Sequence, residues 1–218
     1  MTRSELTERI LRALNDSPTE PVYWSLAEIH AVLQDGQELL AEEVQALRKT
    51  VFVPRRTGAL FYSLASVADD VMAITRIWLR DLHERLEPTT LPALGHRDWM
   101  QWPSTRPYVW FPVSWHAFGV YPHQTTGQGV FEVDYLAWPP ALLDDADEPA
   151  FPEPDQESLV VYGIYAGLIK QWDLIRATDY FQQFVARWSD AQARNGLREL
   201  QGRAWQRDTR HERLTPLR

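Results

Sequence analysis

Residues 129–140 read Gly-Val-Phe-Glu-Val-Asp-Tyr-Leu-Ala-Trp-Pro-Pro, and this stretch decides how the chain is divided. Apolar side chains alternate with polar ones along it, at Phe131, Val133 and Tyr135. Successive side chains of a strand point to opposite faces, so Glu132 and Asp134 share the other face. Pro139-Pro140 follows, and proline removes a donor from the ladder of a sheet. The stretch therefore predicts a half-solvated strand that ends a β-rich region at the two prolines.

Short runs of β-branched and aromatic residues precede this strand. They lie at 50–53, 60–64, 71–79, 108–111 and 117–121. Runs of this kind, bounded by proline, glycine and acidic residues, predict strands. The run 117–121 is separated from the strand 129–137 by a polar loop with glycine near its end, as a hairpin return needs. We therefore expect these two strands to form a hairpin within a β-rich region over residues 48–150.

Two capping boxes mark helices before that region. Thr2 with Glu5 opens a short amphipathic pattern that stops at 15–18, and Ser25 with Glu28 opens a longer one over about 25–47. The sequence therefore predicts two N-terminal helices.

Two more helices are expected after an acidic connector at 144–149. The first begins near Asp155, and its Gly163 and Gly167, one turn apart, would let another backbone approach closely. The second begins near Leu174 and is expected to bend or end at Asn195-Gly196. Its apolar stripe consists of Ala177, Phe181, Phe184, Val185 and Trp188.

These elements predict an α+β protein in three parts. A helical bundle, with two N-terminal and two C-terminal helices, takes residues 1–47 and 151–202. The β-rich, hairpin-containing region over 48–150 is inserted into it. Residues 203–218 lack an apolar face, and we expect them to form an extended C-terminal arm.

Composition excludes several classes of protein. With 218 residues, 44% of them hydrophobic, the chain is long and apolar enough to fold. It has no cysteine, so disulfides and thiolate metal sites are excluded. The N-terminus shows no apolar signal segment, and the longest apolar run, 159–169, is shorter than the roughly 20 residues that span a bilayer. We therefore expect no membrane association.

Charge is distributed unevenly. The whole chain carries −8, which argues against wrapping nucleic acid, whose phosphates require Lys and Arg. Residues 203–218 hold five arginines against two acidic residues, so this arm carries +3 and the remainder −11. The arginines are interspersed with apolar residues, which favours docking on a protein over a nucleic-acid arm. The predicted docking residues are Arg203, Trp205, Arg207, Arg210, Arg213 and Leu214.

Recognisable catalytic chemistry is missing from the sequence. It contains no G-x-S-x-G, P-loop, H-E-x-x-H or G-x-G-x-x-G motif. The expected hairpin would bring a carboxylate, from Glu132 or Asp134, near an imidazole, from His116 or His123, but the alternation favours a solvated strand face. The acidic connector lacks the glycine and the distant glutamate of an EF-hand loop. We therefore predict no enzyme, catalytic residue, cofactor or metal.

Tryptophan is abundant around the β-rich region, at Trp99, Trp102, Trp110, Trp115 and Trp138. Such rings can stack on sugars, or they can fill a small core and an interface, where Trp is enriched. Both interpretations stay open from the sequence.

The order of these features resembles the head-to-tail adaptor proteins of tailed bacteriophages, also called connector or head-completion proteins, including the tail-tube A proteins of short-tailed phages. The resemblance runs over about residues 4–190. Its motifs are Trp24-Ser25-x-x-Glu28-Ile29, Asp35-Gly36-Gln37, Tyr121-Pro122, 129–135 with Pro139, Asp145-x-Asp147-x-Pro149, Phe151-Pro152, 159–166 and Tyr180-Phe181-x-x-Phe184. The chain departs from the family pattern at 86–107, an irregular stretch rich in Trp and Pro.

The resemblance implies a structural virion protein at the head-tail junction, assembled in the host cytoplasm. It implies a homo-oligomeric ring, commonly a dodecamer, that binds the portal protein, meets a tail or nozzle protein and extends the DNA channel. Phage DNA would pass through without sequence-specific binding, and no catalytic residues come with the family. Two alternatives stay open: a carbohydrate-binding or cell-wall-degrading virion component that uses the Trp-rich block, and another tail or capsid accessory protein.

Overall fold

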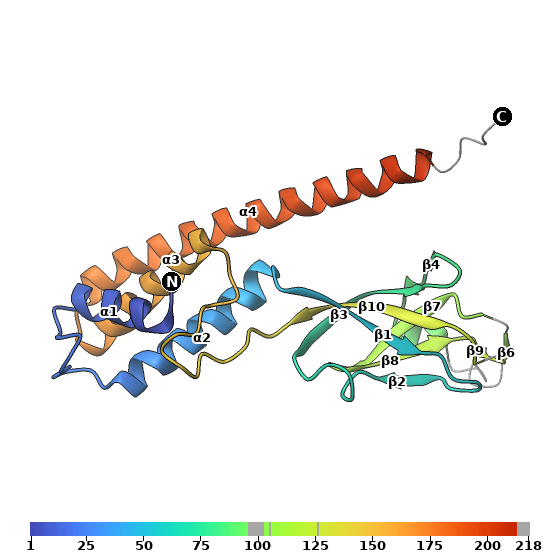
Figure 1. Ribbon diagram of the computed structural model, residues 1–218, viewed down its shortest axis with the longest axis horizontal. Helices are drawn as coiled ribbons and strands as arrows, with labels where there is room; N and C mark the ends of the chain where they lie inside the picture. The colour runs from blue at the N-terminus through green and yellow to red at the C-terminus, as the bar shows by residue number, and fades with distance from the viewer. Residues whose placement is uncertain (96–102, 105, 126, 213–218) are drawn as a thin grey trace. The chain divides into compact units, whose positions relative to one another are not determined.

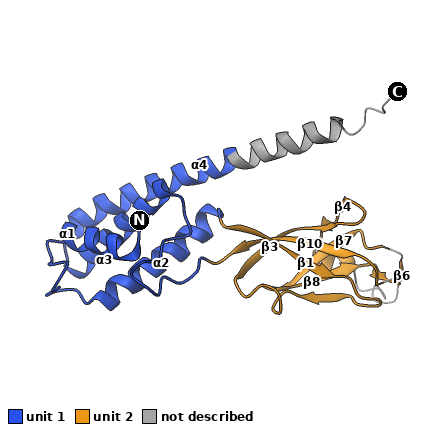
Figure 2. Ribbon diagram, in the orientation of Figure 1, with its two compact units in different colours: residues 1–46, 139–218 blue, residues 47–138 orange. Residues whose placement is uncertain are grey.

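The computed structural model describes residues 1–95, 103–104, 106–125 and 127–212, without the side chains of 103 and 198–212. The chain is an α+β protein, as predicted, and it divides into two compact units (Figure 2). The helical unit comprises residues 1–46 and 139–218, and the β unit comprises residues 47–138. The connector 139–150 thus lies in the helical unit.

Both predicted capping boxes are present in the helical unit. Helix α1 spans Arg3–Ala13 behind Thr2, and α2 spans Leu26–Val44 behind Ser25 (Figure 1). Each cap hydroxyl accepts the N–H of the glutamate three residues on, and each glutamate reaches back to the cap N–H. Helix α3 spans Glu153–Lys170 and α4 spans Leu174–Glu212, so the part of the chain that the structure describes holds two α-helices before the β unit in the sequence and two after it, as predicted.

Glycines allow α1 and α3 to approach each other closely, as predicted. A Cβ atom on Gly163 would overlap with the side chain of Ile10, and one on Gly167 would overlap with Leu14. Ile10 is fully buried at this contact. Small residues at these two positions therefore fix the spacing of α1 and α3.

Helix α4 differs from its prediction in two ways. It passes through Asn195-Gly196 without ending, because the Asn195 side chain donates to the carbonyl oxygens of Val44 (2.8 Å) and Gln45 (3.2 Å) at the end of α2 and does not cap its own helix. The predicted apolar stripe is also shifted. Ala177, Phe184 and Ala191 are buried, whereas Phe181 and Val185 are exposed.

The β unit contains two four-stranded sheets and a small parallel pair. The first sheet has the order β1-β10-β3-β4, and the second has the order β2-β8-β7-β5. The strands are β1 Arg48–Pro54, β2 Phe61–Ser63, β3 Val71–Leu79, β4 Glu84–Arg85, β5 Glu87–Pro88, β7 Val109–Ser114, β8 Ala117–Tyr121 and β10 Val130–Ala137. The parallel pair is β6 Pro103–Ser104 with β9 His123–Gln124, and a short 3-10 helix, η1, covers Leu91–Leu94.

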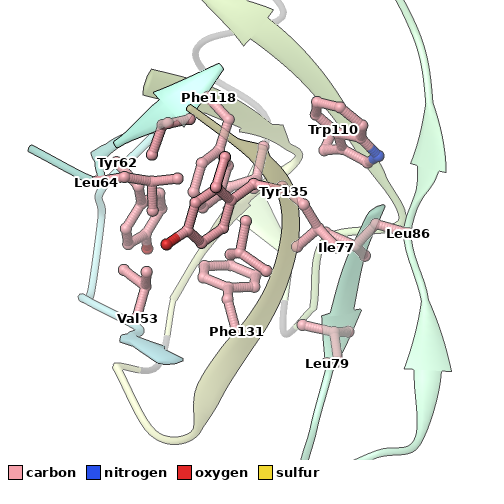
Figure 3. Packing of buried hydrophobic residues seen from close by; sticks show 14 residues of the cluster. Val53, Tyr62, Leu64, Ile77, Leu79, Leu86, Trp110, Phe118, Phe131 and Tyr135 are labelled. Atoms are coloured by element: carbon pink, nitrogen blue, oxygen red, sulfur yellow. The ribbon is translucent and has the colours of Figure 1, made fainter. Parts of the chain in front are cut away.

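The two sheets share one apolar core (Figure 3). Tyr62 of β2 stacks on Phe118 of β8 at 5.4 Å between ring centroids, and both rings meet Phe131 of β10 edge-on. Phe131 and Val133 are fully buried while Glu132 and Asp134 are half-buried, so the predicted alternation of β10 is confirmed.

The predicted hairpin of β8 with β10 is wrong. Strand β8 pairs with β7 and β2 in the second sheet, whereas β10 pairs with β1 and β3 in the first. The polar loop between β8 and β10 carries the chain from one sheet to the other, with β9 on the way. A hairpin does exist between β7 and β8, and Trp115-His116 forms its turn.

Candidate docking surfaces

The predicted docking residues lie at the end of the chain. The backbone at Arg203, Trp205, Arg207 and Arg210 belongs to α4, but these side chains lie outside the described part of the structure. Arg213 and Leu214 lie outside the described residues altogether. The segment thus continues a helix at least to Glu212, where the sequence suggested an extended arm.

The acidic connector uses its carboxylates to hold α1. Asp147 accepts the N–H groups of Asp144 and Leu143, both at 2.7 Å, and these two bonds hold the pKa of Asp147 below its usual value. Asp145 pairs with Arg3 at 2.6 Å, beside the start of α1. Within the described ranges, no cluster of three or more His, Asp or Glu side chains is arranged to hold a metal ion.

The structure does not bring the four candidate acid-base residues together. His116 lies in the turn of the second sheet, His123 lies in β9, and Glu132 lies in β10 of the first sheet. Asp134 accepts the hydroxyl of Thr50 at 2.7 Å and pairs with a guanidinium at 2.6 Å, from Arg76. The carboxylate of Asp134 therefore has a structural role on the face of the sheet.

The tryptophans of the β region are divided between core and surface. Trp110 is buried in the shared core, whereas Trp115 and Trp138 are exposed. Trp99 and Trp102 lie outside the described residues. Trp110 is thus unavailable for stacking on a sugar.

An exposed apolar surface, which the sequence analysis did not predict, covers one end of the helical unit. The loop between α1 and α2 lies here beside the end of α3, where the chain turns into α4 (Figure 1). Tyr23 Oη of this loop donates to the carbonyl oxygen of Lys170, the last residue of α3, at 3.2 Å. Val22 is 92% exposed, Trp172 84% and Ile175 82%. We call Val22, Tyr23, Trp172 and Ile175 the tip surface.

An open pocket of about 470 Å³ lies beside the tip surface. It is lined by Leu14, Asn15, Asp16, Ser17, Val22, Tyr23 and Gln171. Apolar side chains exposed together, next to a concave region, are typical of a protein interaction site. In the sequence, this surface is marked only by large apolar residues inside two loops, Pro21-Val22-Tyr23 and Gln171-Trp172.

Polar contacts hold the two loops of the tip in place. Asp16 accepts the N–H groups of Val22, Tyr23 and Trp24 at 2.9–3.1 Å, and its pKa is lowered, chiefly by the bond from Val22. Lys170 bonds to Glu28 at 2.6 Å and lies 4.0 Å from the centroid of the Trp24 ring. The Lys170 bond, with the bonds from Ser25, lowers the pKa of Glu28 to about 2. The exposed side chains therefore stand on a fixed backbone.

Comparison with known proteins places the chain in a family. No curated protein matches the chain. Among the residues the structure describes, no helix is both long and apolar enough to cross a bilayer. The family model described as SU10 adaptor protein matches residues 1–218, the full length of the sequence. The chain therefore belongs to the SU10 adaptor family, a family of phage head-to-tail adaptor proteins.

Proposed function

We propose that the chain is one subunit of a closed ring that joins the portal protein to the tail and extends the DNA channel. One observation carries the proposal: the adaptor family model covers both units and the C-terminal segment, residues 1–218. A ring at a portal needs identical subunits in head-to-tail contact around an axis. We propose twelve subunits, as is common in the family that the sequence resembles.

The tip surface is our candidate for part of the contact between neighbouring subunits. Its three most exposed apolar side chains come from the loop before α2, the turn after α3 and the first turn of α4. Asp16 and Lys170 bond to the loop before α2 and the first turn of α2, so little conformational freedom is lost there when a neighbour binds. Burying large apolar side chains is the main favourable contribution to association. In the ring, a different surface of the next subunit covers the tip.

The C-terminal segment is our candidate for portal docking. Residues 203–218 carry +3 in a chain that carries −8. Arg203, Arg207 and Arg210 are spaced by four and three positions on a helical backbone, and this spacing places residues on one face of a helix. Arginine and tryptophan are favoured anchors of protein interfaces. Far from the segment, the excess of acidic residues would keep passing DNA from adhering to the channel.

Negative-stain electron microscopy of the purified protein, alone and mixed with the portal of the same phage, tests the ring. We expect rings in one or both samples. Replacing Trp172 and Ile175 together by serine should abolish them, while Leu197→Ser, at a 61% exposed position on α4, should not. A wild-type protein that stays monomeric in both samples contradicts the proposal.

A matched pair of variants tests portal docking. Arg207→Gln with Arg210→Gln should weaken binding to the portal, whereas Arg176→Gln with Arg187→Gln should bind nearly normally, although both pairs lie on α4 and remove the same charge. Deleting residues 203–218 should leave a folded subunit that does not dock. If that truncated subunit still binds the portal, the docking role of the segment is wrong.

A further inference from the structure

Strand β1 is a long edge of the first sheet, and its outer side has no partner strand among the described residues. It has seven residues and pairs with β10 without a register shift. The other outermost strands of the two four-stranded sheets are β2, β4 and β5, which have three, two and two residues. Proteins usually shorten or bulge their edges to prevent pairing with other chains. Strand β1 is neither short nor bulged, and its residues of the kind that discourage pairing, Lys49 and Pro54, stand near its two ends.

Two backbone hydrogen bonds, one at each end of the β1–β10 ladder, fix which peptide groups of β1 point outward. The N–H of Ala137 donates to Leu47 O at 2.8 Å, and the N–H of Arg55 donates to Gly129 O at 3.0 Å. Along a strand of an antiparallel pair, the backbone N–H and C=O groups of one residue point to the partner strand and those of the next residue point away from it. Odd-numbered residues from 47 to 55 therefore bond to β10, and the N–H and C=O groups of Thr50 and Phe52 point away from it.

Pro54 agrees with this assignment. It is an even-numbered residue of β1, so its backbone nitrogen faces away from β10. The N–H that proline lacks is therefore not needed for a bond to the partner strand. The open edge thus offers the peptide groups of Thr50 and Phe52 and ends at Pro54.

The surroundings of this edge carry more positive than negative side chains. Asp81 pairs with Arg55 at 2.6 Å and Asp134 pairs with Arg76, and the remaining carboxylate beside Phe52 is that of Glu132, its cross-strand neighbour on β10. Arg56 and Arg80 are exposed, and no described carboxylate pairs with either of them. The Arg80 guanidinium lies 4.4 Å from the centroid of the Phe52 ring, and Phe52 is 46% exposed.

We propose that the outer edge of β1 is a strand-addition site for an extended segment of another protein of the virion, with an acidic side chain beside Arg80. Main-chain bonds to Thr50 and Phe52 supply the affinity, as in other complexes in which a peptide extends a sheet. A second copy of this chain is a poor occupant, because the long edge that it could offer is its own β1, which repeats the same positive charge, and its β2, β4 and β5 edges are short. The inference holds whether or not the ring and the portal docking are correct.

Hydrogen–deuterium exchange at single amides tests the site on the full chain. The structural proteins of the phage particle are purified and added one at a time. We expect one of them to slow exchange at Thr50 and Phe52 about tenfold or more, while Val51 and Val53, already bonded to β10, change little. If none of them slows these two amides, the proposal is wrong. Protection that rises with the concentration of this chain alone would assign the edge to a second copy and also overturn it.

Two substitutions at one position separate the backbone from the side chain. Thr50→Pro removes the outward N–H together with the hydroxyl bond to Asp134, and should weaken binding about five- to tenfold. Thr50→Val keeps that N–H but loses the bond to Asp134, and should bind like the wild type. Equal binding by the two variants contradicts the proposal. If Thr50→Pro does not fold, Phe52→Pro makes the same change at the next outward position.

The charge is tested with Arg80→Gln. This variant should bind several-fold more weakly at low salt and should respond less to added salt than the wild type. Arg85→Gln, another exposed arginine of the same sheet that lies on β4, is the control and should leave binding unchanged. An Arg80→Gln variant with unchanged affinity and salt response rules out the acidic partner.

Discussion

Gly163 determines how closely α1 and α3 approach, so a single methyl group added there should destabilise the protein. Gly163→Ala forces its Cβ against Ile10, and overpacking of this kind costs about 1–3 kcal/mol. Urea unfolding measures the change. The double variant with Ile10→Val, which removes the overlapping Cδ1 atom, should show a smaller additional cost for Gly163→Ala than the wild-type background does.

Gly196 supplies the matched control for that substitution. It lies in exposed α4, with no atom within 4 Å of the position of a Cβ. Gly196→Ala should therefore stabilise the protein by about 0.5–1 kcal/mol, because alanine loses less conformational entropy in a helix. If Gly163→Ala is also stabilising, the close packing of α1 on α3 is wrong.

Tyr135 should make the stability of the β unit fall as pH rises in the alkaline range. Its hydroxyl donates to Asp70 at 3.0 Å, and burial, with the nearby Asp70 charge, raises the pKa of Tyr135 to about 12. A phenol with a pKa above its unfolded value of about 10 stabilises the fold fully below pH 10, and this contribution is lost as pH rises through 12. Tyr135→Phe should cost about 1 kcal/mol at pH 7 and lose less stability than the wild type between pH 10 and 12. Unfolding curves across that range measure both effects.

The start of α2 is joined to the end of α3 by the bond between Glu28 and Lys170, and the strength of this link should depend on pH. The pKa of Glu28 is lowered to about 2 by Lys170 and Ser25, from a usual value of 4.5. A carboxylate with a lowered pKa stabilises the fold above its unfolded pKa and loses that contribution as pH falls through the folded one. Lys170→Gln should therefore lower the thermal midpoint at pH 7, and its difference from the wild type should shrink between pH 4.5 and 2.

Lys170→Arg is the control for that link. It keeps the positive charge, so its acid dependence should stay close to that of the wild type. A Lys170→Gln deficit that is the same at pH 2 and pH 7 would mean that the cation contributes only through Trp24 and Tyr23.

Local signals predicted most elements, and pairing between distant strands was the main failure. The capping boxes at Thr2 and Ser25 and the alternation in β10 are local, so the sequence contains them fully. The loop after β8 indicates that the chain returns, but a loop looks the same when it leads to another sheet. The true turn of the second sheet, at Trp115-His116, lacks the glycine or asparagine that marks a tight return.

The candidate surfaces were predicted only where their signal is compositional. Charge counting identified the C-terminal segment, because arginines gather there in the sequence. The tip surface combines Val22 with Trp172 and Ile175, which belong to segments far apart in the sequence. Those segments come together only when the helices pack and Tyr23 bonds to the end of α3. The open edge of β1 likewise depends on which strand stands next to β10, and strand order is a property of the tertiary fold.

At the scale of the whole molecule, the β unit should fold without the helical unit. Its apolar core contains residues from both of its sheets and from no helix. The N–H of Ala137 bonds to Leu47 O at 2.8 Å, so the two ends of the unit are fixed side by side by its own sheet. Residues 47–138, expressed alone, should give a dispersed NMR spectrum and one cooperative transition in urea.

The helical unit should likewise survive removal of the β unit, since its chain leaves at Ala46 and re-enters at Pro139. In this shortened protein, a short Gly-Ser linker replaces residues 47–138. A short linker is enough because the Gln37 side chain holds the re-entering chain against α2, through its bond to the Pro140 carbonyl at 2.9 Å. Circular dichroism should retain the helical signal, and Gln37→Ala should destabilise this shortened protein by about 1 kcal/mol or more through the lost bond. If both excised units are disordered, each requires the other to fold. If only the helical unit is disordered, the inserted β unit is needed to hold α2 and the connector together.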